Sequence, residues 1–394
     1  MRRHLVGLPV LAVLLLAGGA RADVHELEMA AGLDAGAEGT GIYALPWGLP
    51  PRQKTPSYGV ARAAWRWLGF WRPNVALSAE FNTDTLAAGL DAYNVGAPGL
   101  SVGLFSRAEL GFAQVSLNQL HDGVNHPERG YTASYAMTGG RASYTVLNRL
   151  TVEGELGGRG WVFTPGPNTD RNWRIPAPFL ALEPRARLKW HDLRPDEGGL
   201  GLHRGMAAML EAGMDVRAFS RSFGGYKGGP VDPRNTVEAG EFPRRISARG
   251  LAGVPLARRL WVGLQGDAGY GHDEDDISRT VIGGMNPYTV NVPGAAWGEW
   301  RSERYVAGHA HAGILPLQNL YVGLSAHLCV LNDPHRVGAL DELGVVRAFA
   351  AEVRVALARV VRWRLSVGGS GDVRRERGPG ALGAFTWFEL GLRQ

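Results

Sequence analysis

The sequence predicts an all-β protein, a transmembrane antiparallel β-barrel of about 16 strands, with 14 as the alternative count. Three observations lead to this fold class. Apolar and polar residues alternate over many long runs. Glycine, at 56 of 394 residues, is about twice as frequent as in average proteins. After residue 22, no stretch is long and apolar enough for a membrane-spanning helix.

The run over 180–190 shows the alternation most clearly. Its apolar and charged residues occupy alternate positions: Leu180, Leu182, Ala186, Leu188 and Trp190 against Glu183, Arg185, Arg187 and Lys189. Such runs extend over about 8–13 residues, close to the ~9–11 that a tilted bilayer-crossing strand needs and longer than the ~5–6 of a usual globular strand. In a membrane barrel the apolar side faces lipid and the charged side faces the lumen. A soluble β-sandwich is the alternative.

The N-terminus has the pattern of a secretory signal peptide. Arg2 and Arg3 precede an apolar stretch over 5–17, and small residues follow up to Ala22. We therefore assign residues 1–22 to a cleaved signal peptide and expect the protein in the outer membrane of a Gram-negative-type cell. A retained membrane anchor is the alternative, but the apolar stretch is shorter than the ~20 residues that an anchor needs.

Residues 23–73 form an N-terminal lead in this assignment, Gly/Pro-rich over 23–57, and residues 74–394 form the barrel. Within the lead, residues 58–71 do not alternate clearly. Arg62 and Arg66 share one face at helical spacing, which predicts a short amphipathic helix or a plug in the lumen. The same residues also fit a first strand that carries an aromatic girdle.

Charged residues on the polar faces are predicted to line the lumen. The candidates are Arg185, Arg187, Arg217, Glu352 and Arg354. Interleaved charges of this kind either cross-link the barrel interior or bias a pore toward certain ions. The arginines are scattered along the chain rather than gathered in one patch, so we expect no nucleic-acid partner despite the net charge of +5.

Hydrolytic and metal chemistry find weak support. His121 and His126 have no serine nearby, and no Gly-x-Ser-x-Gly motif occurs, so an outer-membrane lipid hydrolase is the less favoured alternative to a non-enzyme. His309 and His311 share a strand face, and His327 lies on the next strand, so the three could bind zinc if their side chains converge. Separate lumen-lining residues are the alternative. No cofactor is expected.

An acidic cluster over 273–276 has two interpretations of its own. Carboxylates gathered in one loop could bind Ca²⁺, or Mg²⁺ shared with lipid phosphates. A solvated loop is the alternative and the favoured one.

The last third of the chain resembles the bacterial surface-antigen superfamily, the barrels of outer-membrane assembly factors and two-partner secretion transporters. The resemblance rests on Ile282-Gly283-Gly284 and Pro293-Gly294-Ala295, followed by five strands. It implies a 16-stranded barrel whose loop before the last five strands lies in the lumen, here with Gly283, Gly284, Pro293 and Gly294. The family carries an Arg-Gly-aromatic tip at the position of 293–295.

The resemblance also implies a function. It points to insertion or translocation across the outer membrane, with outer-membrane lipid and unfolded outer-membrane or secreted proteins as partners. A porin-like or hydrophobic-solute channel is the alternative that the pattern leaves open.

Overall fold

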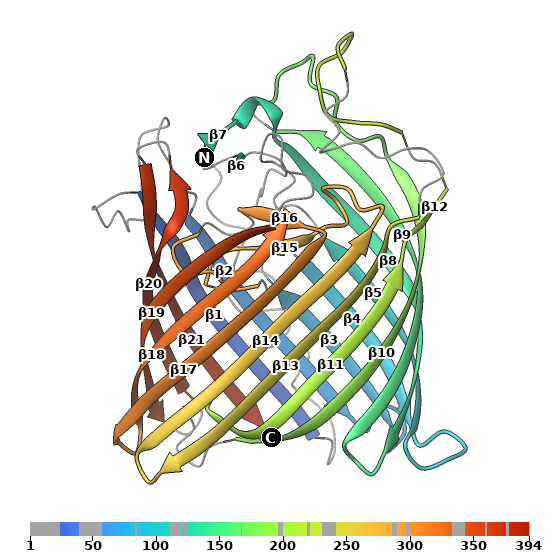
Figure 1. Cartoon of the computed structure of the whole chain (residues 1–394). Coiled ribbons are helices and arrows are strands. Elements are labelled where there is room, and N and C mark those ends of the chain that lie inside the picture. Colours follow the sequence, from blue (N-terminus) through green and yellow to red (C-terminus); the bar gives the residue numbers. More distant parts are fainter. Residues whose placement is uncertain are drawn as a thin grey trace, which may run out of the picture.

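The strands of the computed structural model form one closed antiparallel sheet (Figure 1). The structure describes residues 24–38, 57–82, 85–109, 120–121, 124–166, 168–195, 200–218, 221–230, 242–285, 290–295, 299–332, 343–358, 361–375 and 378–393. The sheet contains β1 (Val24–Glu38), β2 (Ser57–Leu68), β3 (Val75–Asn82), β4 (Thr85–Tyr93), β5 (Leu100–Glu109), β8 (Tyr131–Val146), β9 (Leu150–Pro165), β10 (Phe179–Pro195), β11 (His203–Met214), β12 (Val216–Arg217), β13 (Arg244–Ala257), β14 (Leu260–His272), β17 (Arg304–Leu317), β18 (Leu320–Asn332), β19 (Leu343–Ala358), β20 (Val361–Arg375) and β21 (Gly378–Arg393).

Within the described residues, the barrel wall has sixteen strand positions, which we call staves. β12 continues β11, since both pair with β10, so the seventeen strands of the sheet give sixteen positions around the barrel. Each stave pairs with its neighbours in the sequence, and β1 pairs with β21 to close the ring. The predicted all-β barrel of about 16 strands is confirmed.

The two faces of each strand have the predicted polarity. On β9 the outward-facing Leu156 is 51% exposed, whereas its inward-facing neighbour Glu155 is 4% exposed. Leu104, Leu180, Leu264 and Phe349 are likewise large, apolar and exposed. Because a soluble protein rarely exposes so much contiguous apolar surface, this outer face is suited to lipid.

The barrel begins earlier than position 74. β1 and β2 lie within the predicted lead 23–73, and β2 replaces the predicted helix or plug with a strand. Arg62 and Arg66 are four residues apart, an even spacing that also puts them on one face of a strand. In β1 the alternation is diluted by alanine and glycine, which hid the strand from a reading of polarity. The predicted signal peptide, residues 1–22, lies outside the described residues.

Short elements and loops lie at the end of the barrel away from the C-terminus (Figure 1). β6 (Leu120–His121) pairs with β7 (Val124–Asn125), and a 3₁₀ turn spans Pro127–Arg129. The loop after β9 and the loop after β12 join through a bridge between Trp173 and Tyr226. Within the described ranges, no helix has both the length and the apolar character needed to cross a membrane.

Candidate functional site: the lumen and its loop

A ladder of ion pairs crosses the inner wall at β9, β10 and β11. Arg187 lies directly opposite Glu153 on β9 and Glu211 on β11. Its Nη1 atom lies 2.6 Å from a Glu153 oxygen and 3.0 Å from a Glu155 oxygen, and its Nε atom donates to Glu211. Lys189 adds a 2.8 Å contact to Glu153. The predicted lumen-lining residue Arg187 thus cross-links three staves.

The other predicted lumen residues take part in similar contacts. Arg185 shares the fully buried Glu183 with Arg159, at 2.8 and 2.7 Å. On the opposite wall Glu352 lies between Arg354 and Arg364, the latter at 2.5 Å. These interior charges are therefore largely paired, which makes the wall a cross-linked lining.

Between β14 and β17, the described residues 273–285, 290–295 and 299–303 lie inside the barrel (Figure 1); we call them the lumen loop. It contains the short strands β15 (Thr280–Ile282) and β16 (Trp300–Ser302), which are seen between the walls in Figure 1. Gly283 and Gly284 turn the chain with φ of 116° and 83°. The Gly283 N–H donates to the Val290 carbonyl at 3.0 Å, and the Val292 N–H donates to the Gly284 carbonyl at 3.0 Å.

The far part of the lumen loop packs against β19, β20 and β21. Val292 and Ala295 belong to an apolar cluster with Val346, Val373 and Ala381 of the wall. Gly294 has a φ of +87°, and a Cβ added to it would lie 2.5 Å from the Ala381 carbonyl oxygen. A Cβ added to Gly368 would lie 2.8 Å from the Pro293 Cβ. The glycines allow this tip, residues 292–295, to touch the backbone of the wall.

The near part of the lumen loop contacts the opposite side of the barrel. Ile277 packs on an aromatic cluster of β8–β10 that includes Tyr131, Trp161 and Phe179. Five staves separate β10 from β19, and five separate β21 from β8, so these two walls face each other. The lumen loop therefore crosses the whole lumen.

Buried ion pairs hold the near part in place. Arg217, a predicted lumen residue, donates to Asp275 at 2.8 and 3.3 Å. Arg301 donates to the Asp276 carbonyl at 2.7 Å, and Arg279 lies 3.3 Å from the Asp276 carboxylate and 3.1 Å from Glu303. Asp275 and Asp276 are almost fully buried. The buried carboxylates of the acidic cluster therefore form ion pairs with arginines, and the favoured prediction of a solvated loop does not hold for them.

Burial and these arginines act in opposite directions on the loop carboxyls. Burial tends to raise the pKa of Asp275, but Arg217 and hydrogen bonds from Ser278 outweigh it and lower the pKa. For Glu274 burial dominates over the contact with Arg245 and raises the pKa to about 8. The two carboxyls therefore give the docked loop two separate sensitivities to pH.

A polar cavity of about 370 Å³ remains between the lumen loop and the β9–β13 wall. Arg159, Arg185, Glu211, Arg245 and Arg279 are among its lining residues. The lumen is thus crossed by the loop without being filled.

A second segment folds inward at the end of the barrel that holds the C-terminus. Leu200 and Leu202, just before β11, are buried against Trp261, Tyr321 and Ala356. The Gly201 carbonyl accepts a 3.0 Å hydrogen bond from Arg354. We call residues 200–202 the inner turn. It gives the predicted residue Arg354 a definite partner.

The three histidines of the predicted zinc site do not form one group in the structure. His309 lies directly opposite His327, with ring centroids 4.5 Å apart, but His311 lies opposite Ser325. A Cβ added to Gly263 would lie in contact with the His311 ring, which is therefore turned toward β14. Across the described part of the chain, no group of three or more His, Cys, Asp or Glu side chains could hold a metal ion. The hydroxyl of Ser325 is 2.8 Å from His327 Nε2.

Sequence reasoning missed the arginines of the lumen loop and the inner turn. Arg279 and Arg301 sit in a segment without alternation, so nothing marked them as buried. The signal for the inner turn was present in Leu200-Gly201-Leu202, since two leucines are unusual in a short connection that meets water.

The closed sheet, its apolar outer face and its charged interior define the fold of an outer-membrane β-barrel. Among solved structures it is similar to BamA from Haemophilus ducreyi lacking POTRA domains 1–3, with a TM-score of 0.59 and 11% identity over 93% of this chain and 70% of that chain. It is also similar to CdiB from Acinetobacter baumannii, with a TM-score of 0.52 and 8% identity over 93% of this chain and 60% of that chain. No family model and no curated protein matches the sequence. At these identities the likeness concerns the fold.

Proposed function

We propose that this protein is a gated translocation barrel of the outer membrane, in which the lumen loop is the gate. The observation that carries the proposal is that described residues of the lumen loop contact both sides of the barrel, with Ile277 on one wall and the tip on the other. A passage through the barrel requires that this loop move.

The attachment of the loop suits such a movement. One side is held by a few buried ion pairs, above all Arg217 with Asp275, and the other by a small apolar tip. The attraction within a buried ion pair is largely cancelled by the cost of removing both charges from water. A moved loop whose charges are solvated is therefore close in free energy to the docked loop. The polar cavity beside the loop gives it space on that side.

Passage through the lumen suits this chain better than separation of β1 from β21, the pair that closes the ring and that we call the seam. β1 and β21 pair without interruption from Glu26 and Arg393 to Glu38 and Ala381. Because this seam is as continuous as the other strand pairs, its separation would break a full ladder of backbone hydrogen bonds in lipid, where each unsatisfied group is costly.

The substrate class follows from the family resemblance of the last third. We propose unfolded outer-membrane or secreted proteins as substrates, with outer-membrane lipid around the barrel. Depletion of the protein should then reduce a set of other barrels or exported proteins in the outer membrane. An unchanged outer-membrane proteome would contradict this substrate class. Esterase activity of the purified protein would favour the hydrolase alternative.

The gate is tested by exchanging the charges of one ion pair. Arg217→Asp or Asp275→Arg alone should give frequent large openings in planar bilayers, because each leaves two like charges buried together. The double variant, with both substitutions, should return to the mostly closed state of the wild type. Arg362→Gln, which removes a wall pair with Glu389 away from the loop, is the matched control and should stay closed.

Two results would contradict the gate. A steady large conductance of the wild-type protein would favour the porin-like alternative. Equal conductance of the two single variants and the wild type would show that the loop does not limit passage.

A further inference from the structure

β19 and β20 are hydrogen-bonded to each other along only part of their length, and we call the unpaired part of this boundary the parting. These strands pair from Ala358 and Val361 up to Phe349 and Gly369, and no further. Beyond that point, residues 343–348 pair only with β18, and Ser370, Arg374 and Arg375 pair only with β21. In Figure 1 the upper ends of β20 and β21 rise at the left edge, apart from the strands that lean across the front.

An ion pair bridges the parting. The Asp372 carboxylate accepts hydrogen bonds from the Arg347 backbone N–H at 2.8 Å, from Nε at 3.0 Å and from Nη2 at 3.2 Å. A side chain therefore takes the place of the neighbouring strand's carbonyl. We call Arg347 and Asp372 the latch.

The latch lies on the lipid side of the wall. The Arg347 side chain is 68% exposed, and the outward-facing residues before and after it, Val345 and Phe349, are exposed and apolar. Arg347 is also four residues inside the end of the strand at Leu343. A charged side chain on the lipid face is costly at depth, and Asp372 offsets this cost from within the wall. Asp372 bonds Nε and Nη2, which leaves the exposed Nη1 edge of the guanidinium open to a further anionic partner.

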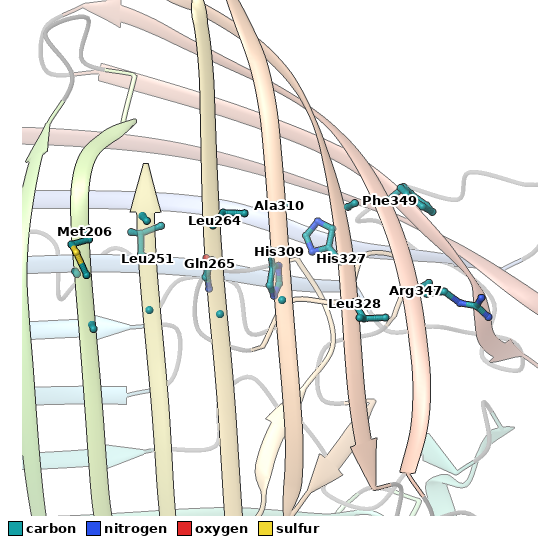
Figure 2. A pocket seen from close by; sticks show the side chains of 17 residues that line it. Met206, Leu251, Leu264, Gln265, His309, Ala310, His327, Leu328, Arg347 and Phe349 are labelled. Atoms are coloured by element: carbon teal, nitrogen blue, oxygen red, sulfur yellow. The ribbon is translucent and has the colours of Figure 1, made fainter. Parts of the chain in front are cut away.

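An apolar groove on the outer surface leads to the latch. Its cavity measures about 690 Å³ and extends from Met206 at one end to Phe349 and Arg347 at the other (Figure 2). Its floor is formed by small residues, because Ala208, Gly250, Gly266 and Gly308 lie in register on four successive strands. Leu264 and Leu328 form part of its walls.

The parting is closed on its inner side by apolar groups. Val346, Ala348 and Val373 line it from within and pack against the tip of the lumen loop. A Cβ added to Gly294 would lie 2.9 Å from the Ser370 backbone nitrogen, so the tip reaches the point where β19 and β20 separate. The inner side of the parting is thus apolar and covered by the tip.

We infer that the groove and the latch form a binding site for an anionic acyl lipid of the surrounding membrane. The acyl chain lies in the groove and against the parting, and the anionic head group pairs with Arg347. The groove selects hydrocarbon because its lining is almost wholly apolar, and the guanidinium at one end selects a negative head group. Its ligand would bind from the lipid and not from the lumen, so the site is tested separately from the gate.

The test uses a phosphatidylglycerol that carries a photoreactive diazirine in its acyl chain, in vesicles that contain the full chain. Illumination and peptide mass spectrometry should place adducts on β11, β13, β14 and β17–β19. Phosphatidylcholine with the same acyl chain should give at least about five-fold fewer adducts there, because it lacks the net negative charge that Arg347 selects. Arg347→Gln should lower the phosphatidylglycerol yield to the same degree, whereas Arg304→Gln should not.

A second variant fills the groove without removing charge. Gly308→Leu should abolish the adducts, and it should fold, because a Cβ at Gly308 meets no atom within 4 Å. Gly154→Leu is the matched control on β9, which does not line the groove and where a Cβ also meets no atom within 4 Å. Adducts spread evenly around the barrel, or unchanged in Arg347→Gln and Gly308→Leu, would overturn the site. The result does not depend on conductance, so it leaves the gate to its own test.

Discussion

At the scale of single residues, the interior of this barrel is governed by the pairing of buried charges. Glu183 is fully buried between Arg159 and Arg185, and Asp275 is nearly so beside Arg217. A single carboxylate lost from such a group leaves an arginine without compensation, which costs far more than the pair gains. Substitution of such a buried residue should therefore lower the free energy of unfolding far more than substitution in an exposed pair.

The Glu183→Gln variant should be strongly destabilised. It leaves the part-buried Arg159 and Arg185 without their shared, fully buried counter-charge, a loss of about 3–5 kcal/mol in the free energy of unfolding. Urea unfolding in detergent micelles measures this loss. Glu80→Gln, which removes a half-exposed pair with Arg62, is the control and should cost about 1 kcal/mol or less. Equal midpoints for the two variants would refute the role of Glu183.

The docking of the lumen loop should depend on pH in two windows. The raised pKa of Glu274 means that docking is favoured at low pH and weakens as the pH rises from 4.5 to about 8, where the docked carboxyl ionises. The lowered pKa of Asp275 means that its contribution is fully present above 3.8 and is lost as the pH falls below that value. The open probability in planar bilayers should therefore rise on both sides of pH 4–5.

Substitution separates these two windows. Glu274→Gln should remove the rise toward pH 8 and keep the rise at acid pH. Asp275→Asn should open the barrel at every pH. A wild-type pH profile in the Glu274→Gln variant would mean that this carboxyl does not control docking.

At the scale of elements, the alternation of apolar and polar residues predicted the strands of the wall. It did not predict the lumen loop, which has no lipid-facing side. The run 180–190 appears in β10 with the expected faces, because lipid on one side and charge on the other impose a period of two. The lumen loop has no period, since it packs on all sides inside the barrel. Its place came from the family resemblance and not from any pattern of polarity.

The stretch 144–156 shows another limit of alternation, because its apolar and polar residues alternate as they would in a single strand. It is a hairpin, in which β8 ends at Val146 and β9 begins at Leu150. Leu147 and Asn148 adopt φ of 53° and 57°, as a tight hairpin turn requires. A leucine in such a turn conceals it, because turns of this kind usually carry glycine or asparagine at both central positions.

Gly294→Val should lift the tip of the lumen loop from the wall. The added side chain would collide with the Ala381 carbonyl, and a φ of +87° strains any β-branched residue. We expect more frequent openings in planar bilayers than in the wild type. Gly154→Val, on the outer face with no atom within 4 Å of its Cβ, is the control. A closed Gly294→Val barrel would remove the tip from the gate.

At the scale of the whole molecule, the sheet has no free edge because β1 pairs with β21. Closure explains why composition and alternation were sufficient to predict the architecture: only helices and closed barrels satisfy their backbone groups in lipid. The contacts that cross the lumen, such as Arg217 with Asp275 and Arg354 with Gly201, join residues far apart in the chain. Such pairs leave no local signal in a single sequence, so the site could be predicted only in part.

Electrophoresis of the detergent-extracted protein, with and without boiling, tests the closed barrel most directly. A ring of sixteen hydrogen-bonded staves should resist dodecyl sulfate until it is heated, so the unheated protein should migrate faster than the boiled one. Identical migration of the two samples, from protein that is otherwise monodisperse, would contradict a closed barrel and with it the gate and the lipid site.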